Sequence, residues 1–163
     1  MSLAVDALNA ARGAGALLVT VESCTGGLVG AALTDVPGSS DAVFGGFITY
    51  ANAAKIALGV APGDLAAHGA VSETVALAMA DAGRARAVAA TNGPAASIAI
   101  TGVAGPGGGT AQKPVGLVHF AFCGPDGTVL HRRELFGDVG RERVRAQSVE
   151  VALTIIIKGL RGG

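Results

Sequence analysis

A short string near the N-terminus, ESCTGG (residues 22–27), places a serine and a cysteine directly after ALLVTV, an apolar run of buried-strand length. A helix is expected to follow. At such a junction the free backbone N–H groups and the helix dipole can stabilise an oxyanion, which would form when Ser23 or Cys24 attacks a carbonyl. The alternative is that Ser23 or Thr25 only caps the helix, a common use of these residue types.

Tyr50, the only tyrosine, and Lys55 form a second candidate pair. Lys55 lies in the apolar string AAKIA (residues 53–57), where burial would lower its pKa and make it a usable neutral base. The alternative is a surface lysine whose stem lies along apolar residues while its amine reaches water. Between the two, Asn52 either orients a substrate amide or begins a turn.

A glycine-rich segment, TGVAGPGGGTAQKP (residues 101–114), can offer backbone donors to a phosphate or a carboxylate. It lacks the Lys-Ser or Lys-Thr pair that completes a Walker A loop, and it has no GxGxxG pattern. The P-loop and Rossmann interpretations therefore fail. The alternative is a plain connection between strands, and Lys113 could add a positive charge to either.

Arg141 and Arg145 share one face near the start of the final helical stretch. Cations at a helix N-terminus oppose the dipole, which costs on the order of a few tenths of a kcal/mol, and this conflict is what an anion site would look like. The alternative is a solvated face on which arginines pair with Asp138 and Glu142.

The histidines and cysteines give no metal or disulfide pattern. The three histidines lack ligand spacing and the two cysteines form no CxxC pair, so we expect no metal site, and we infer a reducing cytoplasm. Cys24 rivals Ser23 as the nucleophile, since a thiolate at a helix N-terminus has a lowered pKa. A Ser-His-Asp triad stays open, although no Gly-x-Ser-x-Gly elbow is present.

Composition limits the class of protein. The chain has 163 residues, of which 50% are hydrophobic and 15% charged, which excludes a disordered chain and a long coiled coil. The formal net charge is zero, so there is no overall attraction to nucleic acid or anionic lipid. No apolar run reaches the roughly 18 to 20 residues of a membrane span, and no basic leader precedes an apolar block. We expect neither a membrane span nor a signal peptide.

The order of apolar and helical stretches predicts the fold. Strands are expected over 16–21, 44–50 and 96–100, with a late hairpin over 115–122 and 128–136. Helices are expected over 3–12, 28–33 and 52–58, and a further helical turn is expected to begin at Pro62. A longer helix is expected from an N-cap at Ser72 to about residue 90, and a final helix after an N-cap at Asp138. We therefore predict a single α/β domain over residues 1–163, a three-layer α/β/α sandwich with a mixed sheet.

Several strings together resemble one family, the CinA C-terminal domain or nicotinamide-nucleotide amidohydrolase family. They follow the family's order over nearly the whole chain: ESCTGG (22–27), TDVPGSS (34–40), FGGFITYANAAK (44–55), HGAVSE (68–73), ITGVAGPGGGT with KPVG (100–116) and the terminal helix. Such a series is far more specific than any one string alone.

The resemblance implies hydrolysis of the carboxamide of nicotinamide mononucleotide (NMN) to nicotinic acid mononucleotide and ammonia, by a metal-independent serine mechanism. It implies Ser23 as the nucleophile and Lys55 as the base. Tyr50 would orient or relay the proton, and Thr101 would be a further active-site residue. The candidates for substrate binding are Cys24, Thr25, Gly26, Gly27, Ser39, Ser40, Asn52, Gly102, Gly105, Gly107 and Arg143.

The same resemblance implies a homo-oligomer that acts on a small nucleotide without a cofactor. The neutral charge and the lack of a long apolar run predict no direct nucleic acid binding and no membrane contact. Two departures from the family pattern matter. Ala51 stands where a small hydroxyl residue is expected, and the spacing from Lys55 to Gly59 is one residue shorter than usual, so either could shift Lys55 or weaken activity. We expect no N-terminal pyrophosphatase-like domain. The alternatives are a nucleotide-binding regulator without turnover and a non-catalytic partner in competence or DNA damage.

Overall fold

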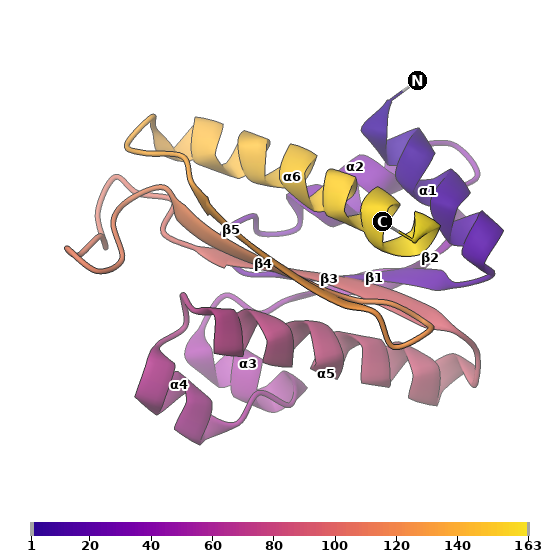
Figure 1. Ribbon diagram of the computed structural model, residues 1–163, viewed down its shortest axis with the longest axis horizontal. Coiled ribbons are helices and arrows are strands. Elements are labelled where there is room, and N and C mark those ends of the chain that lie inside the picture. The colour runs from indigo at the N-terminus through magenta and orange to yellow at the C-terminus, as the bar shows by residue number, and fades with distance from the viewer. Residues whose placement is uncertain (1, 163) are drawn as a thin grey trace.

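A five-stranded sheet with helices on both faces forms the structure, a computed structural model that describes residues 2–162 (Figure 1). Its strands are β1 (Leu17–Glu22), β2 (Val43–Ile48), β3 (Ala95–Gly102), β4 (Leu117–Cys123) and β5 (Val129–Leu135). Its helices are α1 (Leu3–Ala14), α2 (Leu28–Thr34), α3 (Asn52–Leu58), α4 (Pro62–His68), α5 (Glu73–Thr91) and α6 (Arg141–Arg161), with a 3-10 turn at Ser39–Asp41.

The sheet is mixed, with the strand order β2-β1-β3-β4-β5. β1 pairs in parallel with β2 and β3, whereas β3 with β4 and β4 with β5 are antiparallel. The chain leaves β1 through α2 to reach β2 on one side, and then returns past β1 to β3 on the other. The strand order therefore changes direction at the carboxyl ends of β1 and β3, the place where open α/β sheets bind ligands.

Helices α1, α2 and α6 cover one face of the sheet, and α3, α4 and α5 cover the other (Figure 1). The central strands are buried on both faces, and successive side chains alternate between two cores. Leu18 and Ile98 belong to the core under α1 and α6, whereas Val19 and Ala99 belong to the core against α5. The predicted three-layer α/β/α sandwich is confirmed.

Glycines set the close approach of the helices to the sheet. A Cβ on Gly159 of α6 would collide with the ring of Phe122 in β4, and a Cβ on Gly83 of α5 would collide with Val21 in β1. Neither helix could lie at this depth with alanine at these positions, because close-packed interiors leave no room for an extra methyl group.

The predicted elements are all present, with ends shifted by a few residues. Ser72 caps α5 as expected, since its side chain accepts a hydrogen bond from the N–H of Val75 at 3.2 Å. The cap predicted at Asp138 is wrong: α6 begins at Arg141, after Gly140 at φ 97°, and no side chain caps it. Across the described helices, none is both long and apolar enough to cross a membrane.

Candidate active site

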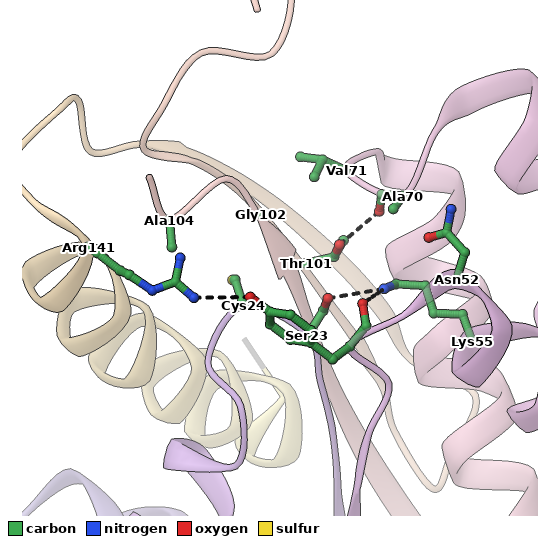
Figure 2. Close-up of a pocket in the computed structure, with 11 residues that line it drawn as sticks. Ser23, Cys24, Asn52, Lys55, Ala70, Val71, Thr101, Gly102, Ala104 and Arg141 are labelled. Carbon is green, nitrogen blue, oxygen red and sulfur yellow. Dashed lines mark hydrogen bonds between the residues drawn. The ribbon is translucent and has the colours of Figure 1, made fainter. Parts of the chain in front are cut away.

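A cavity of about 210 Å³ opens at the carboxyl ends of β1 and β3 (Figure 2). It lies where these strands meet the first turns of α3 and α6 and the segment between α4 and α5. Every residue predicted as catalytic lines it. The lining residues are Ser23, Cys24, Tyr50, Asn52, Lys55, Ala70, Val71, Thr101, Gly102, Ala104 and Arg141.

Ser23 and Lys55 meet in this cavity. Ser23 directly follows β1, and its N–H donates to the carbonyl of Ile100 in β3 at 2.9 Å, which continues the strand pairing. The amine of Lys55 is bonded to the Ser23 hydroxyl oxygen at 3.0 Å and to the carbonyls of Thr49 and Tyr50 at 2.7 and 3.2 Å. Lys55 is only 1% exposed, so the surface-lysine alternative is wrong.

The burial of Lys55 shifts its amine toward the neutral form. Burial lowers the pKa of the amine, and no carboxylate pairs with it in the described part of the chain. A neutral amine has two protons and one lone pair. With the protons on the carbonyls of Thr49 and Tyr50, the lone pair faces the Ser23 hydroxyl, which is the arrangement of a nucleophile and its base.

Tyr50 contributes its main chain to this arrangement rather than its phenol. Its carbonyl accepts from Lys55, whereas its hydroxyl accepts from the guanidinium of Arg141 at 3.1 Å and the residue is 60% exposed. The hydroxyl bonds neither Ser23 nor Lys55. The geometry is therefore compatible with Tyr50 as an orienting partner and gives no support to a proton relay through the phenol.

Glu22 organises the turn after β1, a role that the sequence reasoning missed. Its buried carboxylate accepts hydrogen bonds from the N–H groups of Gly27, Val29 and Gly30 at 3.0, 3.1 and 2.9 Å. The first N–H groups of α2 are thus satisfied by a side chain from the preceding strand. No hydroxyl side chain caps α2, whose N-cap is Gly27, so the capping alternative is wrong.

The expectation that every N–H of this turn faces an oxyanion needs correction. The N–H of Gly26 donates to the Ser23 carbonyl at 3.1 Å, and that of Gly27 goes to the carboxylate described above. The N–H groups of Cys24 and Thr25 donate to no backbone carbonyl within residues 2–162. These two donors, adjacent to Ser23, are the ones left to hold an oxyanion.

Cys24 lines the cavity but lacks the chemistry of a nucleophile. Burial, first of all, raises the pKa of its thiol to about 12, and the negative charge of Glu22 adds to this. The predicted lowering of this pKa is wrong, because the thiol is buried and lies near the negative charge of Glu22. The thiol is therefore protonated at neutral pH, while Ser23 has a base beside it.

Thr101 holds one wall of the cavity in place. Its hydroxyl donates to the carbonyl of Ala70 at 2.8 Å, and Ala70 and Val71 line the cavity from the segment between α4 and α5 (Figure 2). The amine of Lys113 bonds the carbonyl of His68, the last residue of α4. These wall residues were missed as single candidates, although they lie in the HGAVSE string.

The basic start of α6 reaches the site through Arg141 and Arg145, and not through Arg143. Arg141 lines the cavity and donates to the carbonyl of the predicted Gly105 at 2.9 Å, although Gly105 itself does not line the cavity. Arg145 contacts the turn after β1. Arg143 is exposed and does not line the cavity, so its predicted contact with substrate stays a prediction. The spacing of four residues, which puts Arg141 and Arg145 on one face, was the better signal.

Seven further predicted residues do not line the cavity: Thr25, Gly26, Gly27, Ser39, Ser40, Gly105 and Gly107. Ser39 and Ser40 form the turn that precedes β2, and parallel pairing sets the start of β2 beside the start of β1. That is the opposite end of the sheet from Ser23, so within one chain Ser39 and Ser40 do not reach the cavity. Gly107 is exposed and does not line the cavity either.

The histidines lie outside the cavity, so the triad alternative is wrong. His119 Nδ1 and His131 Nε2 are 2.9 Å apart on β4 and β5. Burial, and secondarily His131, lower the pKa of His119 to about 4. Within residues 2–162, no three His, Cys, Asp or Glu side chains gather in a way that could hold a metal ion.

Comparison with known sequences relates this chain to one family. The CinA C-terminal domain profile matches residues 1–160. A CinA-like protein of Anaeromyxobacter sp. (strain K) is 51% identical over 141 residues, which cover 86% of this chain and 33% of that protein. A CinA-like protein of Mycolicibacterium paratuberculosis is 48% identical over 156 residues, covering 93% and 35%. The chain thus spans about a third of the length of the curated relatives it matches.

Solved structures share the fold described above. The competence/damage inducible protein CihA of Agrobacterium tumefaciens superposes with a TM-score of 0.84 and 43% identity over 96% of each chain. The competence damage-inducible protein A of Klebsiella pneumoniae gives a TM-score of 0.87 and 32% identity, over 98% of this chain and 96% of that one. Sequence and fold agree over nearly the full length, and the chain belongs to the CinA C-terminal domain family.

Proposed function

We propose that this domain hydrolyses the carboxamide of NMN to nicotinic acid mononucleotide and ammonia, with Ser23 as the nucleophile. The observation that carries the proposal is the buried amine of Lys55, 3.0 Å from the Ser23 oxygen and without a carboxylate partner among the described residues. A lysine placed in this way serves as the base for a serine nucleophile. The choice of NMN rests on the family resemblance.

In the proposed first step, the Ser23 proton moves to the lone pair of Lys55 while Oγ forms a bond to the amide carbon. The carbonyl oxygen becomes an anion, held by the N–H groups of Cys24 and Thr25. The C–N bond then breaks, and Lys55 returns the proton to the leaving nitrogen, which departs as ammonia. An acyl-enzyme on Ser23 is left.

In the second step, Lys55 takes a proton from water, which attacks the acyl carbon through the same oxyanion. The C–O bond to Ser23 then breaks, Ser23 regains a proton from Lys55, and the carboxylic acid is released. Each positioned proton transfer contributes about 10²- to 10⁴-fold, and a single oxyanion donor about 10²- to 10³-fold.

Two side chains that line the cavity, Arg141 and Asn52, could bind the phosphate and the amide of a nucleotide. Arg141 lines the cavity with its guanidinium on the carbonyl of Gly105 and on the Tyr50 hydroxyl, neutral acceptors that a phosphate can replace. Asn52, the first residue of α3, faces the same space and can hydrogen-bond the carboxamide. We assign the phosphate to Arg141 and the amide group to Asn52.

The departures from the family pattern leave the base in place. Ala51 is the N-cap of α3 and makes no side-chain cap bond, so the missing hydroxyl removes a helix cap and not a contact of Lys55. The shorter spacing ends α3 at Leu58, with Gly59 at φ 138° as its C-cap. Lys55 still bonds Ser23, which favours an enzyme over a regulator without turnover.

The test is an assay of ammonia release from NMN, with calorimetric measurement of NMN binding on the same samples. We expect turnover in the wild type, and a loss of at least about 1,000-fold in Ser23→Ala with an unchanged melting temperature. Binding without turnover would indicate a regulator. Neither binding nor turnover would leave the non-catalytic partner that the names of the competence-related homologues suggest.

We also propose that residues 1–163 act as one domain of a cytoplasmic homo-oligomer that does not contact nucleic acid. Both cysteines, Cys24 and Cys123, are free and buried, which suits a reducing compartment. The zero net charge offers no general attraction to a polyanion. Light scattering of the purified chain tests whether it forms an oligomer. A DNA-binding titration at low salt tests whether it binds nucleic acid.

A further inference from the structure

Arg145 of α6 forms hydrogen bonds with the turn that follows Ser23. Its Nε donates to the carbonyl of Cys24 at 3.1 Å, and its Nη2 donates to the carbonyl of Thr25 at 3.2 Å. Gly26, at φ 58°, leaves room for this contact, because a Cβ there would lie only 3.3 Å from Nη2. No carboxylate pairs with Arg145 in the described residues, and it does not line the cavity.

The two contacts fix the orientation of two successive peptide groups. In a trans peptide, the carbonyl of one residue and the N–H of the next point in opposite directions. Because the Cys24 carbonyl points to Arg145, the N–H of Thr25 points away from α6. Because the Thr25 carbonyl also points to Arg145, the N–H of Gly26 points away too, and it meets the Ser23 carbonyl.

A guanidinium is well suited to this task. Its donors lie in one rigid plane, so bonds from Nε and Nη2 set both the position and the tilt of the turn, which a single ammonium cannot do. Hydrogen bonds to the carbonyl oxygen also polarise a peptide group and strengthen its N–H as a donor. The peptide that benefits is Cys24–Thr25, whose N–H donates to no backbone carbonyl within residues 2–162.

We propose that Arg145 is a positioning residue for the oxyanion site: it orients and polarises the N–H of Thr25, which with the N–H of Cys24 receives the anionic oxygen formed by attack of Ser23. The inference rests on the proposed function. Arg145 acts through the turn and never touches the substrate. Its loss therefore slows the chemical step and leaves NMN binding unchanged.

The first experiment compares Arg145→Gln and Arg145→Lys with the wild type in NMN hydrolysis. We expect kcat to fall about 10- to 100-fold in Arg145→Gln with KM within about twofold, since misplacement of one oxyanion donor has effects of this size. Arg145→Lys keeps the charge but reaches one carbonyl, so its kcat should lie between the two. The matched control is Arg161→Gln, an exposed arginine in the last turn of the same helix, which should behave as the wild type.

The second experiment does not depend on NMN. Acetylation of Ser23 by p-nitrophenyl acetate passes through the same oxyanion, and mass spectrometry of the intact protein measures its rate. We expect Arg145→Ala to be acetylated about 10- to 100-fold more slowly than the wild type. Millimolar ethylguanidinium should restore part of this rate in Arg145→Ala and leave the wild type unchanged, an effect that lost packing alone would not show.

The outcomes separate the two proposals. A wild type that is acetylated at Ser23 but does not release ammonia from NMN contradicts the proposed substrate, and the variants still test Arg145. A wild type with neither reaction overturns both proposals. If the Arg145 variants keep wild-type kcat and acetylation rates, or if KM rises while kcat stays constant, the positioning role is wrong. Rates that fall without rescue in samples with a lowered melting temperature also overturn it.

Discussion

The amine of Lys55 lies 3.0 Å from the hydroxyl oxygen of Ser23, although α2 and β2 separate the two residues along the chain. The contact joins the carboxyl end of a central strand to the first turn of a short helix. The main-chain carbonyls of Thr49 and Tyr50 accept hydrogen bonds from this amine. Within residues 2–162, the backbone rather than a charged partner therefore orients Lys55. The reactivity of the pair therefore depends on the protonation state of a buried amine.

The pH dependence of hydrolysis should follow Lys55. Burial lowers the pKa of this amine from its ordinary value of 10.5, and only the neutral amine can accept the Ser23 proton. We expect kcat/KM for NMN to rise with pH and to level off at a pH below 10.5. A rate that falls between pH 7 and 9, or that is still rising beyond 10.5, would contradict this role. Lys55→Met should lose the pH-dependent activity altogether.

Cys24 should be dispensable and unreactive. Because burial raises the pKa of its thiol to about 12, almost no thiolate exists at pH 8. We expect iodoacetamide at pH 8 to leave the folded protein unlabelled at Cys24 by peptide mass spectrometry. Cys24→Ala should keep turnover within about threefold of the wild type, because its backbone N–H is retained. Inactivation of the wild type by iodoacetamide, with protection in Cys24→Ala, would show the thiol to be accessible.

Arg141→Gln should distinguish the phosphate from the rest of the substrate. A charge-assisted contact to phosphate contributes about 1.5 to 3 kcal/mol, so we expect KM for NMN to rise about 10- to 100-fold. The matched substrate is nicotinamide riboside, which lacks the phosphate. Its kcat/KM should be the same in Arg141→Gln and the wild type. An equal loss with both substrates would place Arg141 at the amide and not at the phosphate.

Ala51→Ser should stabilise the fold. Ala51 has the extended backbone of an N-cap, at φ −78° and ψ 154°, but no side chain to accept a helix N–H. A serine there should add about 1 kcal/mol to the free energy of unfolding, which corresponds to about 2–4 °C in the melting temperature. Thermal denaturation followed by circular dichroism measures this change. Ala51→Val, which adds volume without an acceptor, is the control and should give no gain.

The sequence was sufficient to predict the strands and helices, and the family strings singled out Ser23 and Lys55. Buried strands of this chain are continuous apolar runs, and such runs predict parallel strands covered on both faces. Ser23 and Lys55 could be named as the proposed nucleophile and base because each lies in a string shared with the family. The distance between Ser23 and Lys55 could not be predicted, because it depends on the strand order, which local sequence patterns do not determine.

The supporting contacts were harder to predict because they depend on tertiary geometry. Glu22 looks like the last residue of a strand, yet its carboxylate occupies the N–H groups of α2. Ser39 and Ser40 lie in a family string, but parallel pairing carries them to the other end of the sheet. Arg143 and Arg145 differ only in which side of α6 they occupy, and only the packed helix shows which one faces the turn.

The lack of a side chain at Gly159, near the C-terminal end of α6, affects the position of Arg145 and of the turn that follows Ser23. Gly159 lies against the ring of Phe122, fourteen residues beyond Arg145 and thus about 21 Å further along the helix axis. A continuous helix moves as a rigid body, so a methyl group added at Gly159 would tilt α6 and displace its N-terminal end. The guanidinium would then leave the two carbonyls that it holds. The position of the turn after Ser23 therefore depends partly on the absence of a side chain at Gly159, at the other end of α6.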